Sequence, residues 1–130
     1  MIVRTTEEIT GTERDVADKD WRSKRIILAG DGVGFSFHET TINANSVSKF
    51  HYRHHVEAVW VVEGSGTLTD DETGEQYPLR PGTMYLLDGH ERHRVTCDTQ
   101  LRMLCVFNPP VTGQEVHDAT GAYPSAVQIS

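Results

Sequence analysis

The chain has 130 residues, a length typical of one domain that buries its own core without help from disulfides. Its 19 acidic residues against 12 basic ones give a formal net charge of -7, which argues against binding to the phosphate backbone of nucleic acids. No apolar run is long enough to cross a bilayer, so we expect a cytoplasmic protein with neither nucleic acid nor membrane as a partner.

The first element expected along the chain is a short helix. Residues 12–21 are rich in charged side chains, and Thr10 or Thr12 is placed to cap the first turn. Beyond this stretch, glycine and proline divide the chain into short apolar or alternating segments, as expected for strands. These segments are 25–29, 33–42, 47–52, 58–62, 66–69, 83–87, 94–96 and 102–107. So many short strands predict an all-β sandwich or small barrel with little helix.

Side-chain alternation indicates which faces are buried, because residues two apart on a strand share a face. In segment 33–42, one face carries Ser36, His38 and Thr40, and it is either solvated or lines a cavity. Segment 102–107 is apolar on both faces, which requires a second buried layer from another sheet or from a second subunit. We therefore expect a homodimer.

The segment from His51 to Glu57 reads His-Tyr-Arg-His-His-Val-Glu and directly precedes the apolar segment 58–62. Three imidazoles and a carboxylate are costly to place beside a core unless something there uses them, and a metal ion is the usual user. The two cysteines, Cys97 and Cys105, are too few for a disulfide framework, so we expect buried free thiols. The polar stretch 110–130 is expected to be a mobile tail or a lid.

Two spacings resemble the motifs of the cupin superfamily, and they imply that one cupin barrel spans residues 1–130. The first is Glu57, six residues and then Gly64, and the second is the Pro81-Gly82 turn, Asp88-Gly89 and His93. Cupins normally carry His-x-His before the glutamate, whereas here Arg53 stands two residues after His51. The usual set of three histidines and one glutamate is therefore incomplete in this chain.

Longer segments resemble the ectoine synthase family, in register from about Trp21 to Pro124. They are Gly34-Phe-Ser-Phe-His-Glu-Thr-Thr41, His55-Val-Glu-Ala-Val59, Pro81-Gly-Thr-Met-Tyr-Leu-Leu-Asp88, Val106-Phe-Asn-Pro-Pro110 and Gly113-Gln-Glu-Val-His-Asp118. That family uses iron to close N-γ-acetyl-L-2,4-diaminobutyrate into ectoine, a cyclic amidine and compatible solute, with loss of water. The resemblance implies a carbon–oxygen lyase acting on a small molecule. It also implies Fe²⁺ as the cofactor, with zinc or another divalent transition metal as the alternative, and the ligands Glu57, Tyr85 and His93.

The resemblance and the chemistry of the substrate together suggest the other site residues. The predicted substrate-binding residues are Trp21, Arg25, His38, Thr40 and Phe107. Among them, Arg25 would hold a carboxylate through two parallel hydrogen bonds. The predicted catalytic residues are Tyr52, His55, Glu115 and His117. Tyr52 and His55 would support the ligands or transfer protons. Glu115 or His117 would deprotonate the substrate ammonium from a tail folded over the barrel mouth, which excludes water.

Several of these assignments have a plainer alternative. Arg25 could be an exposed surface charge, and Tyr85 could be an ordinary aromatic residue of the barrel. Glu115 and His117 could be solvated residues of a frayed terminus.

A Lewis acid suits the expected reaction, because an amine must attack an unactivated amide whose oxygen later leaves as water. A carboxylate, a phenolate and an imidazole leave coordination positions open for this purpose. Two other functions remain open: a cupin that senses a small ligand without turnover, and an iron-dependent cupin oxygenase.

Overall fold

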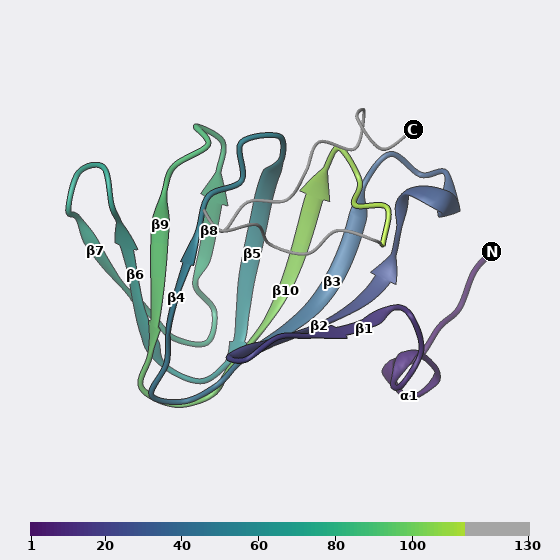
Figure 1. The fold of residues 1–130 in the computed structure, drawn as a ribbon, viewed down its shortest axis with the longest axis horizontal. Helices are drawn as coiled ribbons and strands as arrows, with labels where there is room; N and C mark the ends of the chain where they lie inside the picture. The colour runs from purple at the N-terminus through teal and green to yellow at the C-terminus, as the bar shows by residue number, and fades with distance from the viewer. Residues whose placement is uncertain (114–130) are drawn as a thin grey trace.

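The computed structural model describes residues 1–113, and within them the chain forms ten strands in two antiparallel sheets (Figure 1). The larger sheet has the order β1-β2-β3-β10-β5-β8 and the smaller one β4-β9-β6-β7. The strands are β1 (Asp15–Ala17), β2 (Trp21–Ile27), β3 (Ser36–Ile42), β4 (Val47–Phe50), β5 (Val56–Glu63), β6 (Gly66–Asp70), β7 (Gln76–Leu79), β8 (Met84–Leu87), β9 (His93–Cys97) and β10 (Leu101–Asn108). The predicted all-β class is confirmed.

The helix predicted over residues 12–21 is wrong. Those residues contain β1 and the start of β2, which pair with each other in the register Val16↔Ser23. The helix α1 instead spans Thr6–Ile9. The Thr5 side chain caps it by accepting a hydrogen bond from the Glu8 amide at 3.2 Å, and the Glu8 carboxylate accepts one from the Thr5 amide. Strand pairing with β2 therefore outweighs the charged, helix-like composition of residues 12–21.

Two further elements were missing from the sequence prediction. Strand β7 was missed because three of its four residues, Pro78 among them, are exposed and hide its pattern, although it lies at a sheet edge where proline is tolerated. A 3₁₀ turn, η1, spans Ala29–Asp31 and begins at the last residue of the segment 25–29 that was expected to be a strand. No helix within residues 1–113 combines the length and apolar character needed to cross a membrane.

The inner faces of the two sheets form the core. On β3, the polar face is the buried one: Ser36 and His38 are fully buried, whereas Phe35 and Val33 just before the strand are exposed. On β10, the inner residues Met103, Cys105 and Phe107 are all buried. The alternation predicted for both strands is confirmed, and the polar face of β3 points to the interior rather than to solvent.

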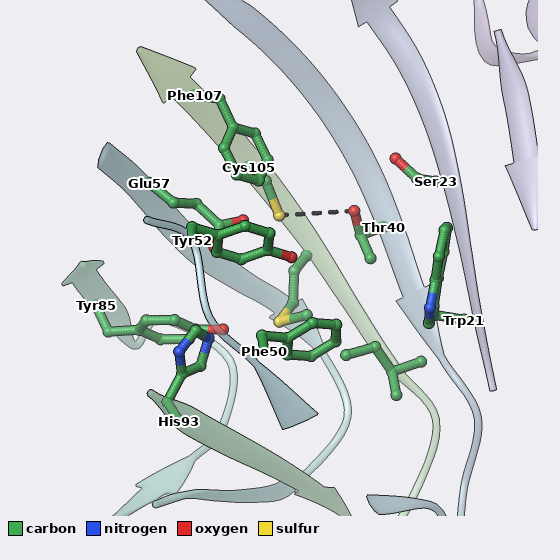
Figure 2. A pocket seen from close by; sticks show the side chains of 12 residues that line it. Trp21, Ser23, Thr40, Phe50, Tyr52, Glu57, Tyr85, His93, Cys105 and Phe107 are labelled. Carbon is green, nitrogen blue, oxygen red and sulfur yellow. Dashed lines mark hydrogen bonds between the residues drawn. The ribbon is translucent and has the colours of Figure 1, made fainter. Parts of the chain in front are cut away.

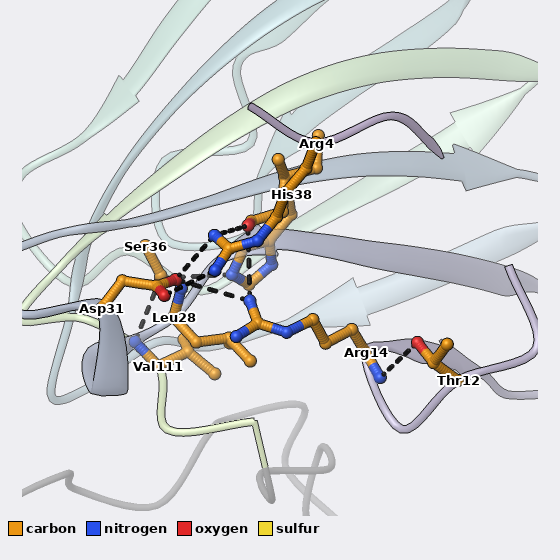
Figure 3. A network of polar contacts seen from close by, with 9 residues as sticks. Arg4, Thr12, Arg14, Leu28, Asp31, Ser36, His38 and Val111 are labelled. Atoms are coloured by element: carbon orange, nitrogen blue, oxygen red, sulfur yellow. Dashed lines mark hydrogen bonds and ion pairs between the residues drawn. The ribbon is translucent and has the colours of Figure 1, made fainter. Parts of the chain in front are cut away.

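The N-terminal segment is tied to the larger sheet by an ionic network (Figure 3). Asp31 accepts from Arg4 at 2.8 and 3.0 Å and lies 3.4 Å from the Arg14 guanidinium. The Asp31 carboxylate also accepts from the Leu28 amide at 3.0 Å. These bonds hold the pKa of Asp31 well below its usual value, the Arg4 hydrogen bond being the largest cause.

Candidate active site

A cavity between the two sheets contains all three residues predicted to bind metal (Figure 2). About 400 Å³ in the cavity and at its mouth is not filled by atoms, a figure that includes open solvent. Its lining consists of Trp21, Ser23, Thr40, Ile42, Phe50, Tyr52, Glu57, Tyr85, His93, Met103, Cys105 and Phe107. Cavities of this kind, mostly apolar with a few converging polar groups, are typical of small-molecule sites.

Glu57, Tyr85 and His93 reach the cavity from three strands. Glu57 lies on β5, and Tyr85 lies on the neighbouring strand β8, where it pairs with Val59. Because Glu57 and Val59 are two residues apart, the side chains of Glu57 and Tyr85 point to the same face of the sheet. His93 starts β9 in the other sheet. Its ring lies next to the Tyr85 ring, with 6.5 Å between the ring centroids (Figure 2). The three side chains therefore face one space from both sheets.

His93 is oriented by the backbone. Its Nδ1 donates to the carbonyl oxygen of Glu91 at 3.0 Å, so the proton of a neutral ring is on Nδ1. Nε2 is then the nitrogen with a free lone pair, which is the arrangement found in histidines that bind metals.

Burial dominates the electrostatics of the cavity. It raises the pKa of Glu57 to about 8, opposed by a hydrogen bond with Cys105. Burial, and next the charge of Glu57, raise the pKa of Tyr85 well above its ordinary value. Burial also lowers the pKa of His93. All three groups are thus disposed to be neutral near pH 7 when nothing is bound.

This donor set fits a metal ion. Burying a carboxylate is costly without a cation, and no ion pair found in residues 1–113 joins Glu57 to a basic side chain. A bound cation would favour the ionised carboxylate and phenolate. In the part of the chain that the structure describes, no group of three His, Cys, Asp or Glu side chains is placed to hold a metal. Among the residues described, Tyr85 offers the further oxygen beside Glu57 and His93, since its side chain opens onto the same cavity.

Cys105 is a cavity residue to which the sequence prediction gave no role in the site. Both cysteines are buried and free, as predicted. The Cys105 sulfur lies 3.7 Å from the hydroxyl of Thr40 and also interacts with the Glu57 carboxyl. Ser23, Phe50 and Met103 likewise line the cavity without having been predicted. Strand parity was the available signal, since Met103 and Cys105 alternate with outward residues on β10.

Aromatic rings form the apolar wall of the cavity. The Tyr52 ring stacks on Phe50 with 5.9 Å between centroids and meets Phe107 edge-on at 5.1 Å. Trp21 lies on the far side, on β2 (Figure 2). The predicted positions of Trp21, Thr40, Tyr52 and Phe107 are therefore brought together around one space.

Arg25, His38 and His55 are buried and are not among the residues that line this cavity. Arg25 is fully buried, which overturns the alternative of an exposed charge, and it donates to the Gly113 carbonyl at 3.1 Å. His38 lies between the hydroxyls of Ser23 and Ser36, at 3.3 and 3.1 Å. Both His38 and His55 pack against Phe107, at 5.0 and 5.8 Å between centroids.

Two of the predicted catalytic residues, Glu115 and His117, lie outside the described residues 1–113. The chain that leads to them is held by buried polar groups. The Val111 amide donates to the Ser36 hydroxyl at 3.0 Å, and Ser36 also contacts His38 (Figure 3).

Comparison with known proteins gives one consistent result. The family profile of ectoine synthase matches residues 1–127. The L-ectoine synthase of Mycobacterium sp. (strain KMS) is 87% identical over 127 residues, which make up 98% of each chain. The crystal structure of ectoine synthase from P. lautus has 50% identity and a TM-score of 0.87, covering 93% of this chain and 87% of that one.

A more distant structure bears on the fold alone. The Cupin 2 conserved barrel domain protein from Salinispora arenicola CNS-205 is 22% identical, with a TM-score of 0.66 over 82% of this chain and 87% of that one. The predicted cupin fold is confirmed. Together with the match along nearly the whole sequence, this shows that the chain belongs to the ectoine synthase family.

Proposed function

We propose that this chain closes N-γ-acetyl-L-2,4-diaminobutyrate into ectoine with loss of water, as a metal-dependent hydro-lyase. Family membership supports the reaction class. The observation that carries the metal dependence is the single cavity onto which Glu57, Tyr85 and His93 all open. A compatible solute of this kind would serve the cell under osmotic stress.

Glu57, Tyr85 and His93 would hold the metal, with Fe²⁺ as the proposed ion and zinc as the alternative. When bound, such an ion supplies Lewis acidity to the acetyl group, whose amide resonance otherwise resists attack by an amine. The side chains of the cavity wall contribute in other ways. Trp21 and Phe107 exclude water, which favours a dehydration and strengthens polar interactions inside the site.

Proton transfer needs groups close to the reacting atoms. The Tyr52 side chain lines the cavity and is buried, so its hydroxyl is a candidate proton donor to the departing oxygen. Thr40 and Cys105 offer a hydroxyl and a thiol that orient the substrate amide or carboxylate. Glu115 or His117 would take the proton from the substrate ammonium.

In this proposal, the buried residues Arg25, His38 and His55 act through the groups that they contact. His38 and His55 pack on Phe107 and fix its ring, while Arg25 holds the Gly113 carbonyl two residues before Glu115. Any contribution of Arg25 to binding the substrate carboxylate then acts through the groups it contacts.

A homodimer is the proposed assembly. Strand β8 is the last strand of the larger sheet, and no other strand within residues 1–113 pairs with its outer edge. On the outer face, Trp60 pairs with Met84, and both are about half exposed, as is Leu86 two residues on. An apolar patch beside an open edge is typical of a subunit interface. The two free, buried thiols suit the proposed location in the reducing cytoplasm.

The decisive experiment is to load purified protein with ferrous iron, exclude oxygen and follow cyclisation of the acetylated diaminobutyrate by NMR. Ring formation that disappears when the metal is chelated is the expected result. Tight binding without turnover would identify a sensory cupin instead. Product formation that consumes oxygen would identify an oxygenase. Either result overturns the proposal.

A further inference from the structure

The loop between β8 and β9, residues 88–92, contacts the candidate metal site at two points without lining the cavity. The first contact is the hydrogen bond from His93 Nδ1 to the Glu91 carbonyl at 3.0 Å. A carbonyl oxygen only accepts, so this bond selects the ring form that carries its proton on Nδ1. The orientation of the Glu91 peptide thus decides which nitrogen of His93 can serve as a ligand.

The Glu91 side chain in turn fixes that peptide. Its carboxylate folds back along the loop and accepts from the Gly89 amide at 2.6 Å. The approach is close, since a Cβ placed on Gly89 would lie 2.9 Å from the same carboxylate oxygen. One residue therefore closes the loop with its side chain and orients His93 with its carbonyl.

The second contact is made by His90. Its backbone has φ 57°, in the left-handed region that non-glycine residues seldom adopt. This conformation is energetically unfavourable and needs other contacts to hold it. Its Nδ1 donates a hydrogen bond to the Tyr52 carbonyl oxygen at 3.0 Å, and this bond helps to hold the conformation. The rings of Tyr52 and His93 are themselves 6.0 Å apart between centroids. The loop thus joins the segment that carries Tyr52 to the strand that carries His93.

We propose that residues 88–92 are a positioning loop in which the Glu91 carboxylate, bound to the Gly89 amide, keeps His93 in the form that presents Nε2 to the metal. Glu91 is a positioning residue and touches neither substrate nor metal. The inference rests on the proposed function, since it assigns Glu91 to the ligand set of that site.

The test compares Glu91→Ala with Glu91→Gln. The glutamine side chain keeps an oxygen that can accept the hydrogen bond from the Gly89 amide, whereas the alanine side chain has no acceptor for it. The ring form of His93 is measured in the metal-free protein by long-range ¹H–¹⁵N NMR. The affinity for Fe²⁺ is measured separately by competition with a chelator. In wild type we expect a single form with the proton on Nδ1.

In Glu91→Ala we expect a mixture of the two ring forms and an Fe²⁺ affinity about 10- to 100-fold weaker. We expect Glu91→Gln to stay within about threefold of wild type, because the retained oxygen keeps the loop closed. Gly89→Ala provides a second variant for the case in which Glu91→Ala does not fold. It displaces the carboxylate from the amide while the backbone at residue 89 stays in an ordinary conformation, so it should resemble Glu91→Ala.

A wild-type ring form and wild-type affinity in the folded variant would overturn the inference. Because the NMR measurement uses metal-free protein, this result is independent of catalysis. Failure of wild-type protein to cyclise the substrate would instead refute the proposed function.

Discussion

Tyr85 is the residue on which the proposed metal site depends, because no third His, Cys, Asp or Glu side chain within residues 1–113 joins Glu57 and His93. Tyr85→Phe should weaken Fe²⁺ binding by at least about a hundredfold, a larger loss than removal of an outer-shell partner, and should abolish cyclisation. The free energy of unfolding of the metal-free protein should change by less than about 1 kcal/mol, because the ring still packs. Chelator competition and urea titration measure the two effects.

Tyr77→Phe is the matched control, since Tyr77 is exposed and hydrogen-bonds Glu75 on the surface. It should leave iron affinity unchanged. Equal affinity in wild type and Tyr85→Phe would remove Tyr85 from the ligand set.

The pKa values of the same residues predict how metal binding depends on pH. Glu57 has a pKa of about 8 and Tyr85 one well above 10, both raised chiefly by burial, so a metal must displace both protons below pH 8. His93 has a lowered pKa and is neutral there. Affinity should therefore rise about a hundredfold per pH unit between roughly pH 6.5 and 8, and about tenfold per unit above that. Affinity that does not change with pH would contradict this ligand set.

At the scale of elements, the turn between β5 and β6 depends on a glycine that has no room for a side chain. Gly64 has φ 96°, and a Cβ there would lie 2.1 Å from the carbonyl oxygen of Gln100. Gly64→Ala should lower the free energy of unfolding by at least about 2 kcal/mol, because it combines a left-handed backbone with a backbone clash. Gly30→Ala is the control, since nothing lies within 4 Å of its added Cβ. Equal urea midpoints for the two variants would contradict this account of the turn.

The link between the N-terminal segment and η1 should be lost in acid. The pKa of Asp31 is depressed in the folded protein, chiefly by Arg4, so its bonds stabilise the fold above the unfolded pKa of about 3.9. This contribution disappears as pH falls below about 4. The stability difference between wild type and Asp31→Asn should thus be constant above about pH 5 and shrink below pH 4. Urea titrations across this range measure it, and a difference that grows in acid would contradict the assignment.

At the scale of the whole molecule, the exposed apolar face along β5 and β8 predicts dimerisation. Leu86→Glu places a charge in that face and should convert a dimer into a monomer in analytical ultracentrifugation. Val47→Glu changes an equally exposed apolar residue on β4 of the other sheet and should leave the dimer intact. A monomeric wild type, or a dimer that persists in Leu86→Glu, would exclude this interface.

The sequence by itself determined the class of the fold, which residues share a face on β3 and β10 and, through family resemblance, residues that meet in one cavity. These features depend on local alternation and on motif spacing, which a linear chain displays directly. The helix predicted over residues 12–21 failed because charge composition is a weak local signal that pairing with β2 overrides.

Only the tertiary structure decided which inward residues border empty space. Arg25 and His38 are fully buried yet do not line the cavity described above, whereas Cys105 does. Glu91 orients His93 through a backbone carbonyl, which no side-chain pattern reveals. The physical reason is that a cavity is the space left between two packed sheets, so its lining depends on side-chain sizes and strand pairings far apart in sequence.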